Sequence, residues 1–354
     1  MNIKQYGYTG NIDTLKDGNI IGRITEEKVI IKTKNLTKTF RRFEKEPGLK
    51  GSVKSLLNRK FIDKTAVSDF DLNVVQGEFV GLIGPNGAGK TTLVKMLTGI
   101  IAPTSGEISV LGYYPNKLET AFKKQYAVVM GQKSQLFFEL TPTDTFRLFK
   151  ELYGIPEADY KRNVGYFVEL FGVADFLNVQ VRTLSLGERM KMELIVALLH
   201  NPSVLFLDEP TIGLDAAAQR QMRLFLKEVN REKGTTIILT SHYMEDVRSL
   251  CPRSIVISGG KKIYDGKTES LFNAYQTRKK ITLSFDSETD FTIKSDNNNW
   301  EVIERTPFKV VLMIPKENSS QTIAGLVLNY SPVDISAEEE DIGTVVGRIY
   351  GEGL

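Results

Sequence analysis

The sequence has little of several residues and patterns that define particular protein classes. Its 354 residues include one cysteine, Cys251, two histidines and one tryptophan. A single cysteine cannot form an intrachain disulfide, which is consistent with a reducing compartment. No apolar run reaches the roughly 18–20 residues that cross a bilayer, and residues 1–5 lack the apolar core of a signal peptide. Any role at a membrane is therefore expected to require a partner.

An excess of charge of one sign is also missing. The chain has 46 basic and 43 acidic residues, a formal net charge of +3, so nucleic acid is not an expected partner. Hydrophobic residues make up 41% and charged residues 25%, which excludes a disordered or collagen-like chain. Dividing the length by about 150 residues per domain predicts two domains.

Short apolar segments alternate with helical patterns along most of the chain. We expect buried strands at 29–33, 79–83, 126–130, 204–207, 235–240 and 254–258, and helices at 93–97, 144–153, 187–199 and 216–230. Apolar runs separated by amphipathic helices are typical of a parallel sheet covered by helices, so the fold class is α/β. Residues 1–28 are polar, lack a sustained period and are left as an unassigned extension.

The pattern changes after about residue 275. Apolar residues alternate with polar ones from Ile281, and 309–314 reads as a second strand, so a small α+β domain is expected over 276–354. Ser336 and Glu339 have the spacing of a capping box, which predicts a final helix. Its apolar stripe would pack on its own domain or on a second copy of the chain, and consists of Ile342, Val345, Val346, Ile349 and Tyr350.

A glycine-rich loop follows the predicted strand at 79–83. It matches the pattern G-x-x-x-x-G-K-[ST] between a buried strand and a helix, a context typical of a phosphate-binding loop. Its backbone N–H groups would surround the phosphates of a nucleotide, Lys90 would reach the β- and γ-phosphates, and the Thr91 hydroxyl would bind Mg²⁺. The residues are Gly84, Pro85, Asn86, Gly87, Ala88, Gly89, Lys90 and Thr91, followed by Thr92.

Two carboxylates end the predicted strand at 204–207. Asp208 and Glu209 would lie at the carboxyl edge of the sheet, where ligands of open α/β folds bind. Asp208 is a candidate Mg²⁺ ligand, and Glu209 is a candidate general base for an attacking water.

With the segment Leu184-Ser185-Leu186-Gly187-Glu188, these motifs resemble those of the ATP-binding subunits of ABC transporters. The resemblance covers about residues 29–266 and implies an ABC-type P-loop ATPase domain, placed at 29–270. The family signature is usually Leu-Ser-Gly-Gly-Gln, so Leu186 and Glu188 depart from it. In the family, the signature binds the γ-phosphate of ATP held by the opposite subunit, which assigns that role to Ser185, Gly187 and Glu188.

Four more residues resemble family motifs. Gln132 corresponds to a glutamine that contacts Mg²⁺ or the attacking water, with Gln135 as a nearby competitor. Asp215 corresponds to a residue that crosses the dimer interface. His242, which is 34 residues after Asp208, corresponds to a histidine that contacts the γ-phosphate, and Phe40 to an aromatic that stacks on adenine.

The residues around Gln132 and an insertion at 41–64 look most like those of the ABC-2-type exporter branch. That resemblance implies separately encoded integral membrane permeases, a second ATPase subunit of the same or a related kind, and a position on the cytoplasmic face of the membrane. The alternatives are the ATPase subunit of an importer and a soluble ABC ATPase unconnected with transport.

The insertion at 41–64 contains eight basic and three acidic residues. Val53, Leu56, Leu57 and Phe61 have helical spacing, which predicts a short basic amphipathic helix. Such a helix would either cover the core of the ATPase domain or contact anionic lipid head groups or the permease.

Overall fold

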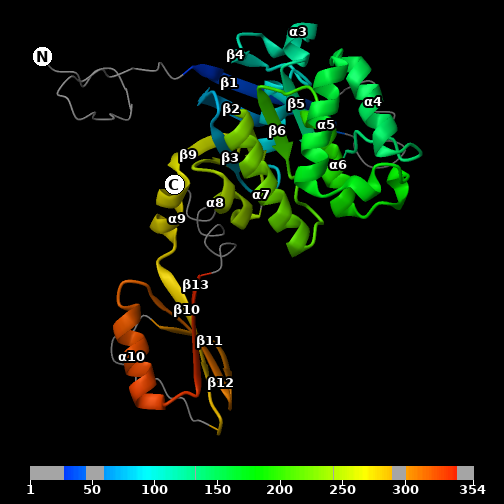
Figure 1. The fold of residues 1–354 in the computed structure, drawn as a ribbon. Helices are drawn as coiled ribbons and strands as arrows, with labels where there is room; N and C mark the ends of the chain where they lie inside the picture. The colour runs from blue at the N-terminus through cyan, green and yellow to red at the C-terminus, as the bar shows by residue number, and fades with distance from the viewer. Residues whose placement is uncertain (1–27, 45–59, 132, 242, 289–299, 341–354) are drawn as a thin grey trace, which may run out of the picture.

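The computed structural model describes residues 28–44, 60–131, 133–241, 243–288 and 300–340 (Figure 1). Helices and strands alternate through the larger upper body in Figure 1, as the apolar pattern predicts, and the α/β fold class is confirmed. Within the described ranges, no helix has the length and apolar character to cross a membrane.

A six-stranded sheet forms the centre of the upper body. Its order is β5-β6-β7-β3-β8-β9, and every pair is parallel except the last, in which β9 returns antiparallel to β8. Every residue of β3, β6 and β7 is buried, which explains their continuous apolar runs. The bounds are β3 Phe79–Ile83, β5 Tyr126–Met130, β6 Val204–Asp208, β7 Thr236–Thr240, β8 Arg253–Ser258 and β9 Lys261–Lys267.

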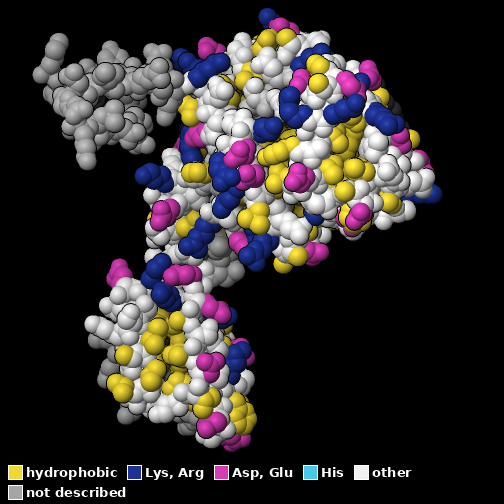
Figure 2. Space-filling view, in the orientation of Figure 1, with side chains coloured by type: hydrophobic (Ala, Val, Ile, Leu, Met, Phe, Trp, Pro, Cys, Tyr) yellow, Lys and Arg dark blue, Asp and Glu magenta, His cyan; other side chains and the backbone are white. Residues whose placement is uncertain are grey.

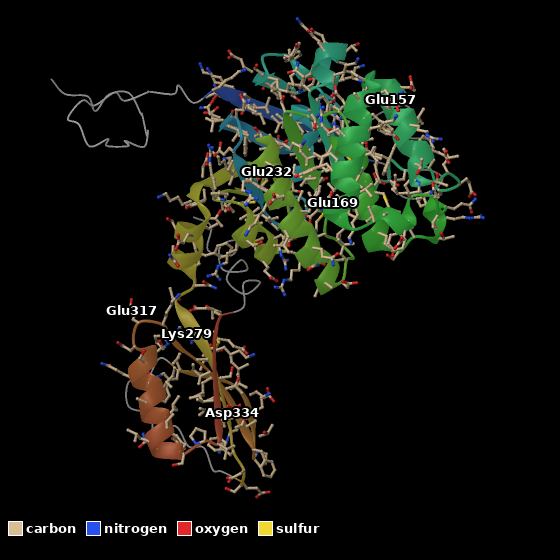
Figure 3. The ribbon with its side chains drawn as sticks, viewed as in Figure 1. Glu157, Glu169, Glu232, Lys279, Glu317 and Asp334 are labelled. Carbon is tan, nitrogen blue, oxygen red and sulfur yellow. The ribbon has the colours of Figure 1, made fainter. Side chains whose placement is uncertain are left out.

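Helices surround this sheet. Exposed glutamates on α5 and α7 mark their solvent faces, among them Glu157, Glu169 and Glu232 (Figure 3). The helices are α2 Lys90–Leu97, α3 Thr120–Lys123, α4 Pro142–Tyr153, α5 Glu157–Phe171, α6 Leu186–Leu198, α7 Ala216–Lys233, α8 Met244–Leu250 and α9 Thr268–Tyr275, with short 3₁₀ turns at Pro115–Lys117, Ala174–Phe176 and Val181–Thr183.

A second, antiparallel sheet has the order β2-β1-β4, with β1 at Val29–Glu44, β2 at Lys60–Val75 and β4 at Ser105–Val110. The hairpin of β1 and β2 extends to the pair Glu44 and Lys60, and Phe61 pairs with Phe43. The prediction that Phe61 belongs to a helix is therefore wrong, because cross-strand pairing satisfies its backbone. The other helix positions, Val53, Leu56 and Leu57, lie outside the described residues.

The lower body in Figure 1 is a four-stranded antiparallel sheet with one helix. Hydrophobic side chains gather between the helix and the sheet (Figure 2), where Leu283, Leu312 and Leu326 are buried. The order is β11-β12-β10-β13, with β10 at Arg278–Ser284, β11 at Glu301–Thr306, β12 at Lys309–Pro315, β13 at Asp334–Glu339, and the helix α10 at Ser319–Tyr330.

The predicted capping box at the end of the chain is wrong. Ser336 and Glu339 lie in β13, which starts at Asp334 (Figure 3) and pairs with β10. Pairing places Glu339 opposite Lys279, and their side chains form an ion pair of 3.8 Å. The cross-strand partner therefore overrides the local pattern. The apolar positions predicted for the helix, 342–350, lie outside the described residues.

Candidate functional site

The glycine-rich loop joins β3 to α2 in a conformation that depends on its glycines. Gly89 has a φ of +113°, and a Cβ there would lie 2.3 Å from the carbonyl oxygen of Ala66. A Cβ at Gly84 would lie 2.4 Å from the carbonyl oxygen of Ile257. No other residue fits either position without movement of the backbone, so both glycines are required for the close packing of the loop. The loop leads into the N-terminus of α2, where backbone N–H groups favour an anion.

Lys90 is folded back over this loop. Its Nζ donates to the carbonyl oxygens of Gly84 at 2.5 Å and Pro85 at 3.3 Å, and the side chain is almost fully buried. Burial lowers the pKa of Lys90, while the carboxylates of Glu209 and Asp208 act in the opposite direction. The lysine is therefore a buried cation placed between the loop and the two carboxylates predicted from the sequence.

Oxygen atoms from three elements meet at Asp208. The Thr91 hydroxyl donates to Asp208 Oδ1 at 3.1 Å and Oδ2 at 3.0 Å, and the Thr240 hydroxyl donates to Oδ1 at 2.6 Å. Mg²⁺ binds to proteins through one or two carboxylates together with phosphate oxygens and water. The donor set of Thr91 and Asp208, at the wall of a cavity that contains the phosphate loop, fits that ion.

Glu209 follows β6 with a left-handed backbone, at a φ of +54°. Its backbone N–H donates to the carbonyl oxygen of Thr240 at 3.0 Å, which holds this unusual conformation in place. The Glu209 Oε1 atom lies 4.0 Å from the Nζ of Lys90. The turn after the strand therefore directs a carboxylate toward the lysine of the phosphate loop.

These residues line one cavity of about 600 Å³, a volume typical of a small-molecule site. Phe40 lies at its wall and is 37% exposed, and Lys38 lies over the Phe40 ring at 5.3 Å. Three lysines that sequence reasoning missed also line the cavity, Lys64, Lys95 and Lys133. Only the fold brings them together, because they come from β2, α2 and the segment after β5.

The signature residues Ser185, Gly187 and Glu188 do not line this cavity. Ser185 and Glu188 instead form a capping box at the start of α6, in which Ser185 N donates to Glu188 Oε2 at 2.8 Å and Glu188 N donates to Ser185 Oγ at 3.3 Å. A Ser-x-x-Glu pattern signals this cap, and it was missed in the sequence. Asp215 also lies outside the cavity and caps α7 through Ala218 N at 2.8 Å.

The remaining predicted residues are Gln132 and His242, and both lie outside the described residues. The described neighbours of Gln132, namely Met130, Gly131 and Lys133, line the cavity, whereas Ser241 and Tyr243 beside His242 do not. Gln135, the competitor for the role of Gln132, donates from Nε2 to the carbonyl oxygen of Val128 at 2.9 Å and does not line the cavity. The geometry therefore gives no support to Gln135 in that role.

A strand, a phosphate-binding loop and a helix next to an Asp-Glu strand end define a P-loop nucleotide-binding protein. Residues 67–212 match the family model described as ABC transporter. The ABC transporter ATP-binding protein NatA of Bacillus subtilis is 36% identical over 221 residues, which cover 61% of this chain and 89% of that protein. The chain belongs to the family of ABC transporter ATP-binding proteins.

Two further similarities agree with this family. The Nod factor export ATP-binding protein I of Cupriavidus pinatubonensis is 35% identical over 219 residues, covering 62% of this chain and 66% of that protein. A solved dimeric structure of the ATP-binding cassette MJ0796, bound to ADP and Pi, shares the fold with a TM-score of 0.56 at 24% identity. That match covers 68% of this chain and 99% of the cassette.

Proposed function

We propose that this chain hydrolyses ATP as the energy-supplying subunit of an ABC-2-type exporter. The observation that carries the proposal is the meeting of Lys90, Thr91, Asp208 and Glu209 at one cavity beside a phosphate-binding loop. The oxygen of a water attacks the γ-phosphorus of ATP, the bond from that phosphorus to the bridging oxygen of ADP breaks, and Glu209 accepts the proton of the water.

Each side chain in the cavity has a separate part in this reaction. Lys90 neutralises charge on the β- and γ-phosphates, and Phe40 stacks on the adenine ring. Thr91 and Asp208 would hold Mg²⁺, which when bound neutralises charge on phosphate oxygens. By resemblance, Gln132 and His242 contact the water and the γ-phosphate. Lys64, Lys95 and Lys133 add positive charge to the same wall.

Two copies of the chain, or one copy with a related chain, are proposed to complete each other's sites. The capped N-terminus of α6 does not line the cavity beside the phosphate loop, which supports a role for Ser185, Gly187 and Glu188 at the nucleotide of the facing subunit. Leu186 N–H and Gly187 N–H lie in the first turn of α6, where they suit a phosphate of the facing subunit. Asp215 would cross this interface, and the dimeric state of the MJ0796 cassette supports the arrangement.

The partners proposed for this pair are integral membrane permeases on whose cytoplasmic side the chain would bind. Export rather than import is supported by the similarity to the Nod factor export protein. Exposed aromatic residues near Lys133, namely Phe137 and Phe138, provide a surface for a permease helix. The basic stretch 41–64 would add a contact with lipid head groups. We also propose that residues 29–270 form the ATPase domain and 276–354 an accessory domain, in line with their separate sheets.

This function is tested by co-expressing the chain with the membrane proteins encoded beside its gene and reconstituting the purified complex in vesicles. We expect the permeases to stimulate ATP hydrolysis by the chain several-fold and the chain to stay with them through purification. A Glu209→Gln complex is the control for background hydrolysis. A soluble ABC ATPase would be favoured if no neighbouring membrane protein changes the rate of ATP hydrolysis and the chain binds to ribosomes or DNA.

A further inference from the structure

Helix α6 carries a buried carboxylate, Glu193, that is only 4% exposed. It accepts hydrogen bonds from the backbone N–H of Gln135 at 2.9 Å, from that of Leu136 at 3.3 Å, and from the hydroxyl of Ser134. Burial raises the pKa of this carboxyl group, and its hydrogen bonds act in the opposite direction. Among the described residues no lysine or arginine forms an ion pair with it, so these donors, together with the charge of Arg189 on the same helix, compensate its burial.

The segment held by Glu193 follows β5, whose end lies beside the end of β6 that carries Asp208 and Glu209. Gly131 N donates to the carbonyl oxygen of Asp208 at 2.9 Å. A Cβ on Gly131 would lie 2.3 Å from the carbonyl oxygen of Glu209, so the two backbones touch. Gln135 Nε2 ties the segment to β5 through Val128 at 2.9 Å. The backbone that follows β5 thus contacts the catalytic turn at Gly131 and α6 at Gln135.

Helix α6 also carries the signature residues, at its N-terminus. Glu193 lies eight residues after Ser185 on the same helix, a distance of about 12 Å along its axis. Phe138 makes two further contacts with this region. The Arg189 guanidinium lies over its ring at 5.4 Å, and Arg182 N donates to its carbonyl oxygen at 3.1 Å. Since a hydrogen-bonded helix is stiff over two turns, displacement of residues 134–136 would displace the N-terminus of α6.

We propose that Glu193 is a positioning residue that clamps residues 134–136 to α6, so that the catalytic strand end and the signature of one subunit move together when the dimer closes. The inference rests on the proposed function, since closure brings the signature onto the nucleotide of the facing subunit. Glu193 does not itself line the nucleotide cavity, so we expect the affinity of the open subunit for ATP to change little when the clamp is removed.

The test compares Glu193→Ala and Glu193→Gln in the full chain. We expect Glu193→Ala to lower kcat for ATP hydrolysis about tenfold, with the Kd of a fluorescent ATP analogue within about twofold of the original value. In a Glu209→Gln background, it should raise the protein concentration needed for ATP-dependent dimerisation about tenfold. Glu193→Gln keeps an acceptor oxygen for Gln135 N–H and should recover part of the loss.

Asp265→Ala provides a control for general destabilisation. Asp265 is an exposed residue of β9 whose side chain is 20% exposed, accepts from Arg253 Nε at 2.6 Å and Lys262 Nζ at 2.9 Å, and lies outside the nucleotide cavity. This variant should lower Tm without a change in kcat. A Glu193→Ala variant whose kcat is unchanged, or falls no further than that of Asp265→Ala at an equal loss of Tm, would overturn the proposal.

Amide hydrogen exchange tests the clamp without relying on ATP hydrolysis. In Glu193→Ala, exchange should rise at residues 134–136 and also at the first turn of α6, because the two are joined. If exchange rises only at residues 134–136, the clamp does not reach the signature and the proposal fails. If wild-type chain hydrolyses no ATP but this joint change in exchange is seen, the proposed function fails and the clamp stands.

Discussion

Replacing Glu209 with glutamine is expected to lower kcat for ATP hydrolysis by about 10²–10⁴-fold, the range for loss of a general base. An amide is uncharged and cannot accept the proton of the attacking water at neutral pH. The backbone of residue 209 is held by Thr240, so the substitution leaves the loop in place. ATP affinity should stay within about threefold, because in the proposed site the loop and Lys90 bind the phosphates.

The same Glu209→Gln variant should accumulate as an ATP-bound dimer, since closure persists when hydrolysis fails to reverse it. Steady-state phosphate release and size-exclusion chromatography with ATP measure the two effects. Glu245→Gln is a suitable control, because Glu245 is an exposed carboxylate that pairs with Arg223 at 3.0 Å outside the cavity. Normal turnover in Glu209→Gln would refute its assignment as the base.

Replacing Lys90 with alanine should weaken ATP binding by about 10–100-fold, as expected for the loss of a charge-assisted contact to phosphate worth about 1.5–3 kcal/mol. Hydrolysis should fall with it, because no other cation is placed between the loop and Glu209 at the same distance in the described part of the site. Removing the buried ammonium group also removes its hydrogen bond to the carbonyl oxygen of Gly84, so the Tm of the nucleotide-free variant is expected to fall.

Isothermal titration with ATP and Mg²⁺ measures the affinity of the Lys90→Ala variant. Lys161→Ala, at an exposed position of α5, is the matched control and should bind as the original chain does. An unchanged ATP affinity in Lys90→Ala would remove the phosphate-loop assignment that underlies the account.

The sequence was sufficient to predict the parts of the fold whose signals are local. The apolar run of β3 and the glycines after it predict the observed succession of strand, loop and helix, because a buried parallel strand and a backbone with positive φ each restrict the residues allowed. The Asp-Glu pair at the end of β6 was predicted because β6 is also a buried parallel strand with a continuous apolar run. These features position the catalytic edge of the sheet.

Features set by distant pairing were not predictable. Ser336 and Glu339 have the spacing of a helix cap, but β10 supplies a strand partner and the segment is β13. Phe61 has helical spacing, but it pairs with Phe43 in a hairpin. The lysines Lys64, Lys95 and Lys133 have no shared local pattern, and only folding places them at one wall.

One departure of the signature from its usual residues is compatible with the structure, because glutamate and glutamine can each complete a capping box. Glu188 replaces the usual glutamine and receives the Ser185 N–H at 2.8 Å, so it completes the cap of α6. The predicted roles of Gln132 and His242 remain predictions, because both residues lie outside the described part of the chain.

The central claim is that an ATP site is made by the phosphate loop of one subunit and the signature of another. Mixing two inactive variants, Lys90→Ala and Ser185→Arg, tests it most directly. A mixed dimer has one site in which the original Lys90 faces the original Ser185, so the account predicts recovery of up to about a quarter of the original ATPase activity. If both variants fold and exchange subunits but the mixture stays inactive at every ratio, the shared site is contradicted.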